Sequence, residues 1–170
     1  MRRDKAIDYT AGSINGDEKL IRLLCSPLQY DKTTHQVSVD AFDLRLLGKN
    51  GDNPEPYTSL IRCKCFSKEE DLIKYLYLGY RIWDDKPSET NTYYGYATFL
   101  CADARAVSPI IEIWPLKGDK PEHIGMFFVQ DEYRYYKGPL PKSDPVILEM
   151  LGDLSELIAD NIIEAPVRNP

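Results

Sequence analysis

His123 is the residue whose type and setting most suggest chemistry. It stands in the stretch KPEHIGMFF, after a Pro-Glu turn and directly before an apolar run. A histidine gains or loses a proton near neutral pH, so it can act as a general base that a loop carboxylate orients. It can equally pin a turn by donating a ring N–H to a backbone carbonyl. Because the sequence names no partner residue, we expect the structural role and keep the catalytic role as the alternative.

Two pairs of adjacent carboxylates are further candidates for acid–base chemistry. They are Asp84 with Asp85, and Asp131 with Glu132. Both pairs fall in segments that we expect to be loops, where acids are usually solvated. The sequence has neither the G-x-S-x-G elbow of serine hydrolases nor the glycine frame of a phosphate-binding loop. We therefore expect no cofactor and name no catalytic residue other than the alternative at His123.

The chain has four cysteines, Cys25, Cys63, Cys65 and Cys101. A structural zinc site usually needs two pairs of ligands, each pair separated by two to four residues. Here only Cys63 and Cys65 are close together, so we expect no metal site and thiols that behave as small apolar groups. No apolar leader precedes them, which favours free thiols in the reducing cytoplasm.

Tyrosine is unusually frequent, with 12 copies, many of them in TYYGYATF and DEYRYYKG. Alternate side chains of a strand share a face, so some of these rings cannot lie in a core. Enrichment in Tyr and Arg is typical of protein–protein interfaces. The alternative is that tyrosines pair across strands and stabilise a sheet. The predicted partner-binding residues are Tyr93, Tyr94, Tyr133, Arg134, Tyr135 and Tyr136.

Length and charge restrict the class of protein. A chain of 170 residues is expected to form one domain. Its net charge of −6 argues against direct binding of nucleic acid, which needs a basic field. The same charge suits a basic protein partner. No apolar run reaches the roughly 18 residues that a membrane-spanning helix needs.

Two segments have the signals of helices. The first covers residues 67–82, where Ser67 and Glu70 form a capping box. The second covers residues 144–162, with Pro145 at the first helical position and apolar residues at helical spacing.

The remaining regular segments have the signals of strands. Segment 57–66 alternates in polarity, which predicts Ile61, Cys63 and Cys65 as its buried set. The predicted strands, or pairs of strands, cover residues 19–27, 57–66, 92–107, 110–116 and 123–130. The order of elements predicts an α+β fold, with two main helices packed on a mostly antiparallel sheet. We expect a loosely ordered arm over 1–18, the domain over 19–163 and a frayed tail over 164–170.

Three stretches resemble small uncharacterised bacterial proteins: KLIRLLCSPLQYDKTTHQVSVDAF, CKCFSKEEDL and DKPEHIGMFF. These proteins share a late Pro-x-His-x-x-[Ile/Met] signature. The matching features are Pro27, Ala41, Phe42, Pro121, His123 and Met126. The resemblance implies a cytoplasmic accessory protein of a bacterial conflict or antiviral defence operon, and it implies no activity.

We therefore expect a non-catalytic protein-binding accessory or regulatory subunit, of the toxin–antitoxin or immunity type. Its partner would be a basic effector or a larger subunit of a defence complex. The alternative is a small enzyme that uses His123 as general base with a loop carboxylate.

Overall fold

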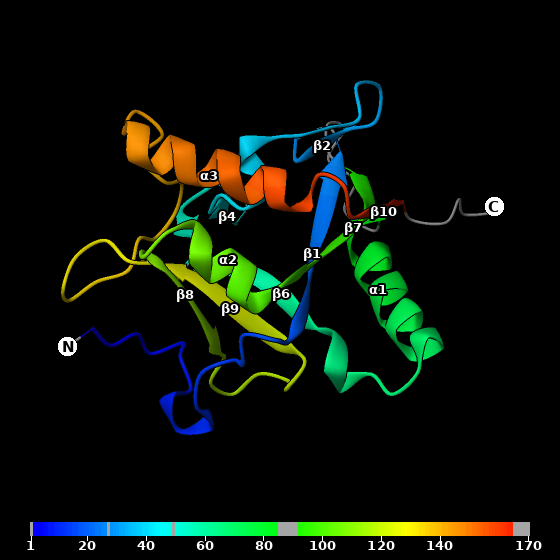
Figure 1. The fold of residues 1–170 in the computed structure, drawn as a ribbon, viewed down its shortest axis with the longest axis horizontal. Coiled ribbons are helices and arrows are strands. Elements are labelled where there is room, and N and C mark those ends of the chain that lie inside the picture. Colours follow the sequence, from blue (N-terminus) through cyan, green and yellow to red (C-terminus); the bar gives the residue numbers. More distant parts are fainter. Residues whose placement is uncertain (1, 27, 49, 85–91, 165–170) are drawn as a thin grey trace.

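A six-stranded antiparallel sheet is the framework of the computed structural model (Figure 1). The structure describes residues 2–26, 28–48, 50–84 and 92–164. The strands run in the order β10-β7-β1-β6-β9-β8 across the sheet. Their bounds are β1 Lys19–Ser26, β6 Thr58–Arg62, β7 Thr92–Leu100, β8 Ile111–Pro115, β9 His123–Phe128 and β10 Ile162–Glu164.

Three α-helices pack on this sheet, which confirms the α+β class. They are α1 Glu69–Asp84, α2 Cys101–Val107 and α3 Pro145–Ile158. The predicted fold had two main helices, and α2 was wrongly assigned to a strand over 92–107. This helix has only seven residues, of which Cys101 and Ala104 are buried, so its apolar period is too short to stand out. None of the helices in the described ranges is long and apolar enough to cross a bilayer.

The first predicted helix begins two residues later than expected. The backbone N–H groups of Asp71 and Leu72 both donate to the carbonyl of Lys68, so the first turn closes there and not at Ser67. The acids Glu69 and Glu70 lie in this first turn, where the helix dipole favours negative charge.

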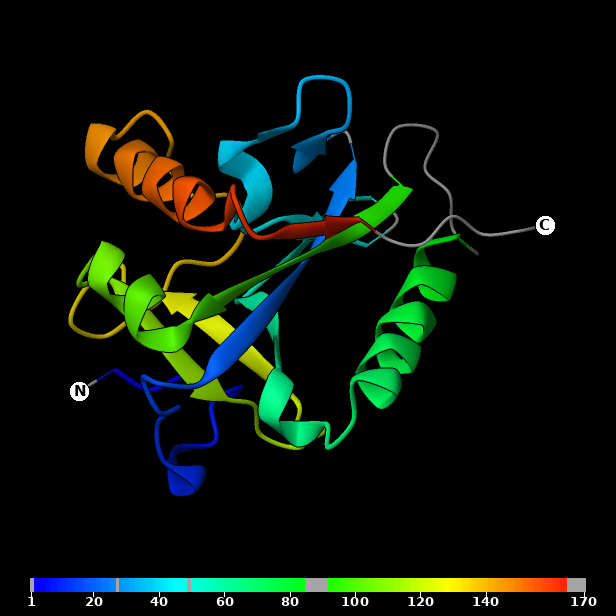
Figure 2. The ribbon, with the colours of Figure 1, turned by 45° about the vertical axis from the view of Figure 1, so that its right-hand side comes forward.

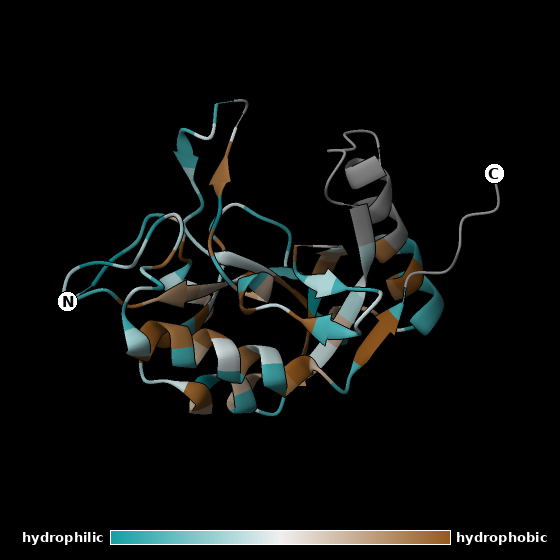
Figure 3. Ribbon diagram, turned by 90° about the horizontal axis from the view of Figure 1, so that it is seen from above, coloured by the Kyte–Doolittle hydropathy of each residue, from teal (hydrophilic) through white to brown (hydrophobic). Residues whose placement is uncertain are grey.

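The second predicted helix, α3, ends at Ile158 and is followed by the edge strand β10. The prediction extended it wrongly to residue 162. Its start is set by Asp144, whose carboxylate accepts a hydrogen bond from the N–H of Val146 at 3.0 Å. Apolar and polar residues alternate along α3, as the brown and teal bands of Figure 3 show, and its apolar face lies against the sheet.

The helices cover opposite faces of the sheet (Figure 2). Because side chains alternate along a strand, β1 sends Leu20 to the face under α2 and α3 and Ile21 to the face under α1. The core under α2 and α3 includes Leu20, Leu60, Ile113, Met126 and Leu151. The smaller core under α1 includes Ile21, Ile61 and Leu76.

The segment after β6 departs from the predicted strand. The strand ends at Arg62, and Cys63–Cys65 forms a 3-10 helix. The turn of this helix leaves Cys63 half-buried and Cys65 exposed, so the prediction that both are buried was wrong. Leu60 and Ile61 bury their side chains on opposite faces of the sheet instead.

Residues 2–18, predicted to be a loose arm, pack beside strand β8 at one edge of the sheet (blue in Figure 1). Ile7 forms a β-bridge with Leu116, and the N–H of Asp8 donates to the carbonyl of Pro115 at 3.0 Å. Ile7 and Ile14 are almost completely buried. Ile7 packs with Phe127 on the face that α1 covers in part, whereas Ile14 belongs to the core under α2 and α3. The predicted tail beyond residue 164 lies outside the described residues.

Two short hairpins complete the structure. β2 Tyr30–Asp31 pairs with β3 Gln36–Val37, and β4 Leu46–Leu47 pairs with β5 Asn53–Pro54.

Candidate functional site

His123 has a carboxylate partner in the structure. Its Nδ1 atom lies 2.8 Å from Oδ2 of Asp119, a residue of the turn before β9. The ring of Tyr57 packs edge-on against the imidazole, with 6.0 Å between the ring centroids. Burial of Asp119 raises its pKa, but the hydrogen bonds from the Lys120 N–H and the His123 ring outweigh this, so the pKa lies below its ordinary value. Asp119 is therefore ionised at neutral pH.

This pair has the arrangement of a base and its orienting group. An ionised Asp119 accepts a hydrogen bond from Nδ1–H of the neutral ring, which leaves Nε2 of His123 as the acceptor. Nε2 has no hydrogen-bond partner among the residues that the structure describes. The imidazole is a quarter exposed, so a solvent-borne molecule can reach it. Asp119 belongs to neither of the acid pairs that the sequence singled out. Of those pairs, Asp84 is the last residue of α1, Asp85 lies outside the described residues, and Asp131 and Glu132 lie in a loop.

The six predicted partner-binding residues differ in how far the fold exposes them. Tyr94 and Tyr135 are only 5% and 6% exposed. Tyr94 stacks on Tyr30, and the hydroxyl of Tyr135 donates to Glu112 at 2.8 Å. These two rings are therefore enclosed.

The other four predicted residues differ in access. Tyr133 is 67% exposed, and Arg134 is also exposed. Tyr136 is half-buried against the larger core. Tyr93 lies in β7, but its side chain is outside the described part of the chain. Tyr133 and Arg134 remain as the fully accessible members of the predicted set.

Tyr133 sits at the tip of a turn that is held by hydrogen bonds. Oδ1 of Asp131 accepts from the N–H groups of Tyr133 and Arg134, at 2.8 and 2.9 Å. Oδ2 accepts from the guanidinium of Arg134, which holds the pKa of Asp131 below its ordinary value. The backbone N–H of Gln130 closes the turn on the Arg134 carbonyl at 2.9 Å. The turn is thus ordered before any partner arrives.

The exposed face of α3 is acidic. Glu149, Asp153 and Glu156 lie on it, and Asp160 follows just beyond its end. The spacings of four, three and four residues put these side chains on one side of the helix. The helix carries no Lys or Arg. None of the four acids forms an ion pair with the residues that the structure describes.

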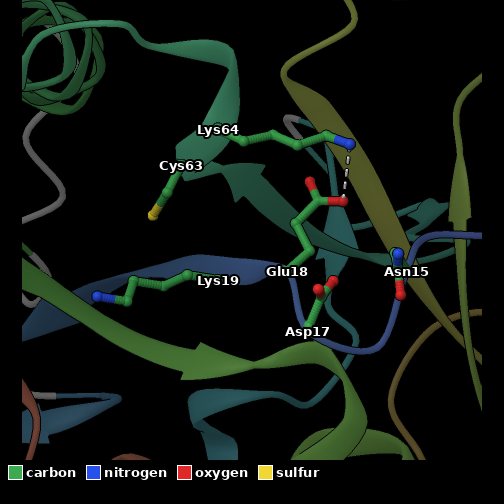
Figure 4. Close-up of a pocket in the computed structure, with 6 residues that line it drawn as sticks. All are labelled: Asn15, Asp17, Glu18, Lys19, Cys63 and Lys64. Atoms are coloured by element: carbon green, nitrogen blue, oxygen red, sulfur yellow. Dashed lines mark ion pairs between the residues drawn. The ribbon is translucent and has the colours of Figure 1, made fainter.

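A cavity of about 480 Å³ opens where the chain enters β1, beside the 3-10 helix that follows β6 (Figure 4). Its lining residues are Asn15, Asp17, Glu18, Lys19, Cys63 and Lys64. Glu18 is nearly buried and binds the guanidinium of Arg62 through Nε at 2.5 Å and Nη2 at 3.0 Å. Nζ of Lys64 lies 3.4 Å from Oε2 of the same carboxylate, and a dashed line in Figure 4 marks this ion pair.

The sequence alone did not point to this cluster. Its one local signal is that Arg62 and Lys64 alternate with the predicted buried set of segment 57–66. Glu18 is 44 residues away in sequence. Only the pairing of Leu20 with Arg62 brings the two charges together.

Three of the four cysteines are poor nucleophiles. All four are free, and burial raises the pKa of Cys25, Cys63 and Cys101. A raised thiol pKa leaves little thiolate at neutral pH. Within the described ranges, no three Cys, His, Asp or Glu side chains gather to hold a metal ion.

Comparison with protein-family models, with curated proteins and with solved structures finds no match to this chain.

Proposed function

We propose that this chain is a protein-binding accessory or regulatory subunit. The observation that carries the proposal is Tyr133, which is 67% exposed at the tip of a turn already fixed by Asp131. Exposed aromatic and arginine side chains are the usual anchors of interfaces. An anchor on an ordered turn binds more tightly because less conformational entropy is lost on association.

The partner that fits this surface is basic. The acidic face of α3 has no compensating cation on its own helix, and the whole chain has a net charge of −6. The loop around Tyr133, gold in Figures 1 and 2, and the first turn of α3 lie at the same end of the molecule in both views. The acids of α3 begin one turn further on, at Glu149, and their charge would speed encounter with a basic effector.

The setting that we propose is a bacterial defence or immunity-type system of the cytoplasm. It is supported by the resemblance of the three sequence stretches described above, and by no other observation. The binding proposal is independent of it, because it depends only on the exposed turn and the charge of α3.

A photo-crosslinking amino acid at position 133 tests the binding proposal in the cell that produces the protein. We expect one crosslinked partner with a basic surface. With that partner purified, Tyr133→Ala should weaken binding by at least about tenfold, because an anchoring tyrosine commonly contributes more than 1 kcal/mol. The affinity would be measured by isothermal titration calorimetry.

The neighbouring exposed residue Glu132 supplies the matched control. Glu132→Ala should keep the affinity within about threefold, since a rim residue contributes little. Equal affinity of Tyr133→Ala and the parent chain would contradict the proposal. So would a crosslinker at position 133 that captures nothing while one placed elsewhere on the surface captures the partner.

The paired geometry of His123 and Asp119 favours a second candidate function, a small enzyme with His123 as general base. We expect His123→Ala to abolish any turnover of a panel of chromogenic esters and to shift the melting temperature by less than about 3 °C, as for a partly exposed pair worth at most about 1 kcal/mol. A parent chain without turnover, together with a larger drop in melting temperature, would show that the pair only holds the turn before β9.

A further inference from the structure

The guanidinium of Arg2 lies against the turn that carries Tyr133, although 129 positions separate Arg2 from Asp131 in the sequence. Nη1 donates to the carbonyl of Asp131 at 3.1 Å, and Nη2 donates to Oε2 of Glu112 on β8 at 3.0 Å. The centre of the guanidinium lies 5.9 Å from the centroid of the Tyr135 ring. One side chain therefore joins the edge strand of the sheet to both ends of the turn.

The residues that follow Arg2 hold it in this place along β8. The backbone N–H of Asp4 donates to the hydroxyl of Tyr9 at 2.9 Å. The Tyr9 ring packs on Trp114 of β8, with 5.3 Å between the ring centroids, and Ile7 is almost completely buried. Arg2 thus reaches the turn from a segment that is itself fixed to the sheet.

Glu112 is the shared acceptor of this contact. Its Oε1 accepts from Nε1 of Trp114 at 2.9 Å and from the hydroxyl of Tyr135 at 2.8 Å, while Oε2 accepts from Arg2. Burial raises the pKa of Glu112, but these three hydrogen bonds outweigh it, so the pKa lies below its ordinary value. The carboxylate is ionised at neutral pH, and a charge-assisted hydrogen bond to Arg2 is stronger than a neutral one.

Asp131 connects Arg2 to the exposed tyrosine. Its carboxylate accepts from the N–H groups of Tyr133 and Arg134, and its carbonyl accepts from Arg2. Among the residues that the structure describes, Arg2 is the only donor to that carbonyl. The residue that sets the conformation of the tip is therefore itself held from outside the turn.

We propose that Arg2 is a positioning residue for partner binding, which holds the Tyr133 turn in the conformation that the partner recognises. A turn that is restrained before association loses less conformational entropy when it binds. Arginine suits this place because one planar fork serves a carbonyl and a carboxylate together. The proposal rests on the protein-binding function above and adds residues 2–9 to the parts of the chain that determine its affinity.

Amide hydrogen exchange of the free chain tests the positioning without a partner. Arg2→Ala should speed exchange at the N–H groups of Tyr133 and Arg134 by at least about fivefold, the factor that one net hydrogen bond contributes. The measurement is NMR magnetisation transfer from water. Arg2→Lys should give an intermediate rate, because one ammonium cannot serve both acceptors.

The exposed neighbour Arg3 supplies the matched control. Arg3→Ala removes the same charge from the next position and should leave exchange at the turn unchanged. The melting temperatures of Arg2→Ala and Arg3→Ala should both stay within about 3 °C of the parent chain, since the contact is partly exposed.

A double-mutant cycle tests whether Arg2 acts on binding through Tyr133. With the partner captured by the crosslinker at position 133, Arg2→Ala should weaken binding by about fivefold. The double variant of Arg2→Ala and Tyr133→Ala should bind no more weakly than Tyr133→Ala alone, because the ring that Arg2 positions is already absent. Isothermal titration calorimetry measures the four affinities.

The outcomes separate this proposal from the one on which it rests. Equal exchange rates in Arg2→Ala and Arg3→Ala overturn the positioning role, whether or not Tyr133 binds a partner. Losses of affinity that add in the double variant overturn it as well, because Arg2 would then act independently of the ring. A Tyr133→Ala variant that binds as tightly as the parent chain contradicts the protein-binding function instead, and faster exchange in Arg2→Ala would still show that Arg2 orders the turn.

Discussion

Replacing Glu18 by glutamine is expected to lower the free energy of unfolding at neutral pH by about 3 kcal/mol. The carboxylate is nearly buried and binds two nitrogens of Arg62, with Lys64 as a third contact. Glutamine keeps the size of the side chain but removes the charge, which leaves the partly buried guanidinium without its counterion. Urea unfolding followed by circular dichroism measures the change.

The effect should depend on pH in a defined direction. Burial raises the pKa of Glu18, but Arg62 and Lys64 outweigh it and hold the pKa below its ordinary value of 4.5. A carboxyl whose pKa is lower in the folded chain stabilises the fold above that ordinary value. This stabilisation is lost as the pH falls through the lowered pKa. The parent chain and Glu18→Gln should therefore differ most at neutral pH and converge as the pH falls below the lowered pKa of Glu18.

Asp17 provides the matched control, because it is the preceding residue, lines the same cavity and is exposed. Asp17→Asn should change the free energy of unfolding by less than about 0.5 kcal/mol. A Glu18→Gln variant as stable as Asp17→Asn would mean that the ion pair does not hold β1 to the segment after β6.

Replacing Arg22 by leucine is expected to lower the free energy of unfolding by about 2 to 3 kcal/mol. Strands β1 and β6 pair at Leu20 with Arg62 and at Ile21 with Ile61. Just beyond, the buried guanidinium of Arg22 donates to the carbonyls of Ser59 at 3.2 Å and Ala41 at 2.8 Å. The side chain thus links the two strands by hydrogen bonds where their backbone pairing ends. Leucine would leave the carbonyls of Ser59 and Ala41 without this donor.

Arg22 remains charged at neutral pH even though burial, with the nearby charge of Arg45, lowers its pKa to about 10. Arg22→Lys should restore only part of the stability that Arg22→Leu loses. The lysine keeps the charge and one donor, but one ammonium cannot reach both carbonyls as a planar guanidinium does. The exposed Arg3→Leu variant should be neutral within about 0.5 kcal/mol. If Arg22→Leu unfolds at the same urea concentration as Arg3→Leu, the two carbonyls have found other donors.

Both variants concern the part of the sheet around β1. Glu18 fixes the chain before β1, and the N–H of Cys101 donates to its carbonyl, which sets the end of β7.

The sequence by itself determined the α+β class and the elements with a strong period. Along α3, apolar residues recur at helical spacing over fourteen residues, and β1 and β9 are apolar runs bounded by turn residues. Helix α2 and strand β10, with seven and three residues, are too short to show a period of their own. Their conformation is decided by packing, because α2 buries Cys101 and Ala104 and β10 pairs with β7.

For the candidate sites, the sequence supplied residue types and the tertiary structure decided which of them meet. His123 was identifiable, and Asp119 is only four residues away, but several other loop acids were equally available until the turn placed one of them at Nδ1. Tyr133 and Tyr135 lie two residues apart and have the same type, yet one is exposed and the other is bound to Glu112 on β8. The Glu18–Arg62 pair depends on the register of β1 against β6, and a pattern of period two fixes which face a residue takes but not its partner across the sheet.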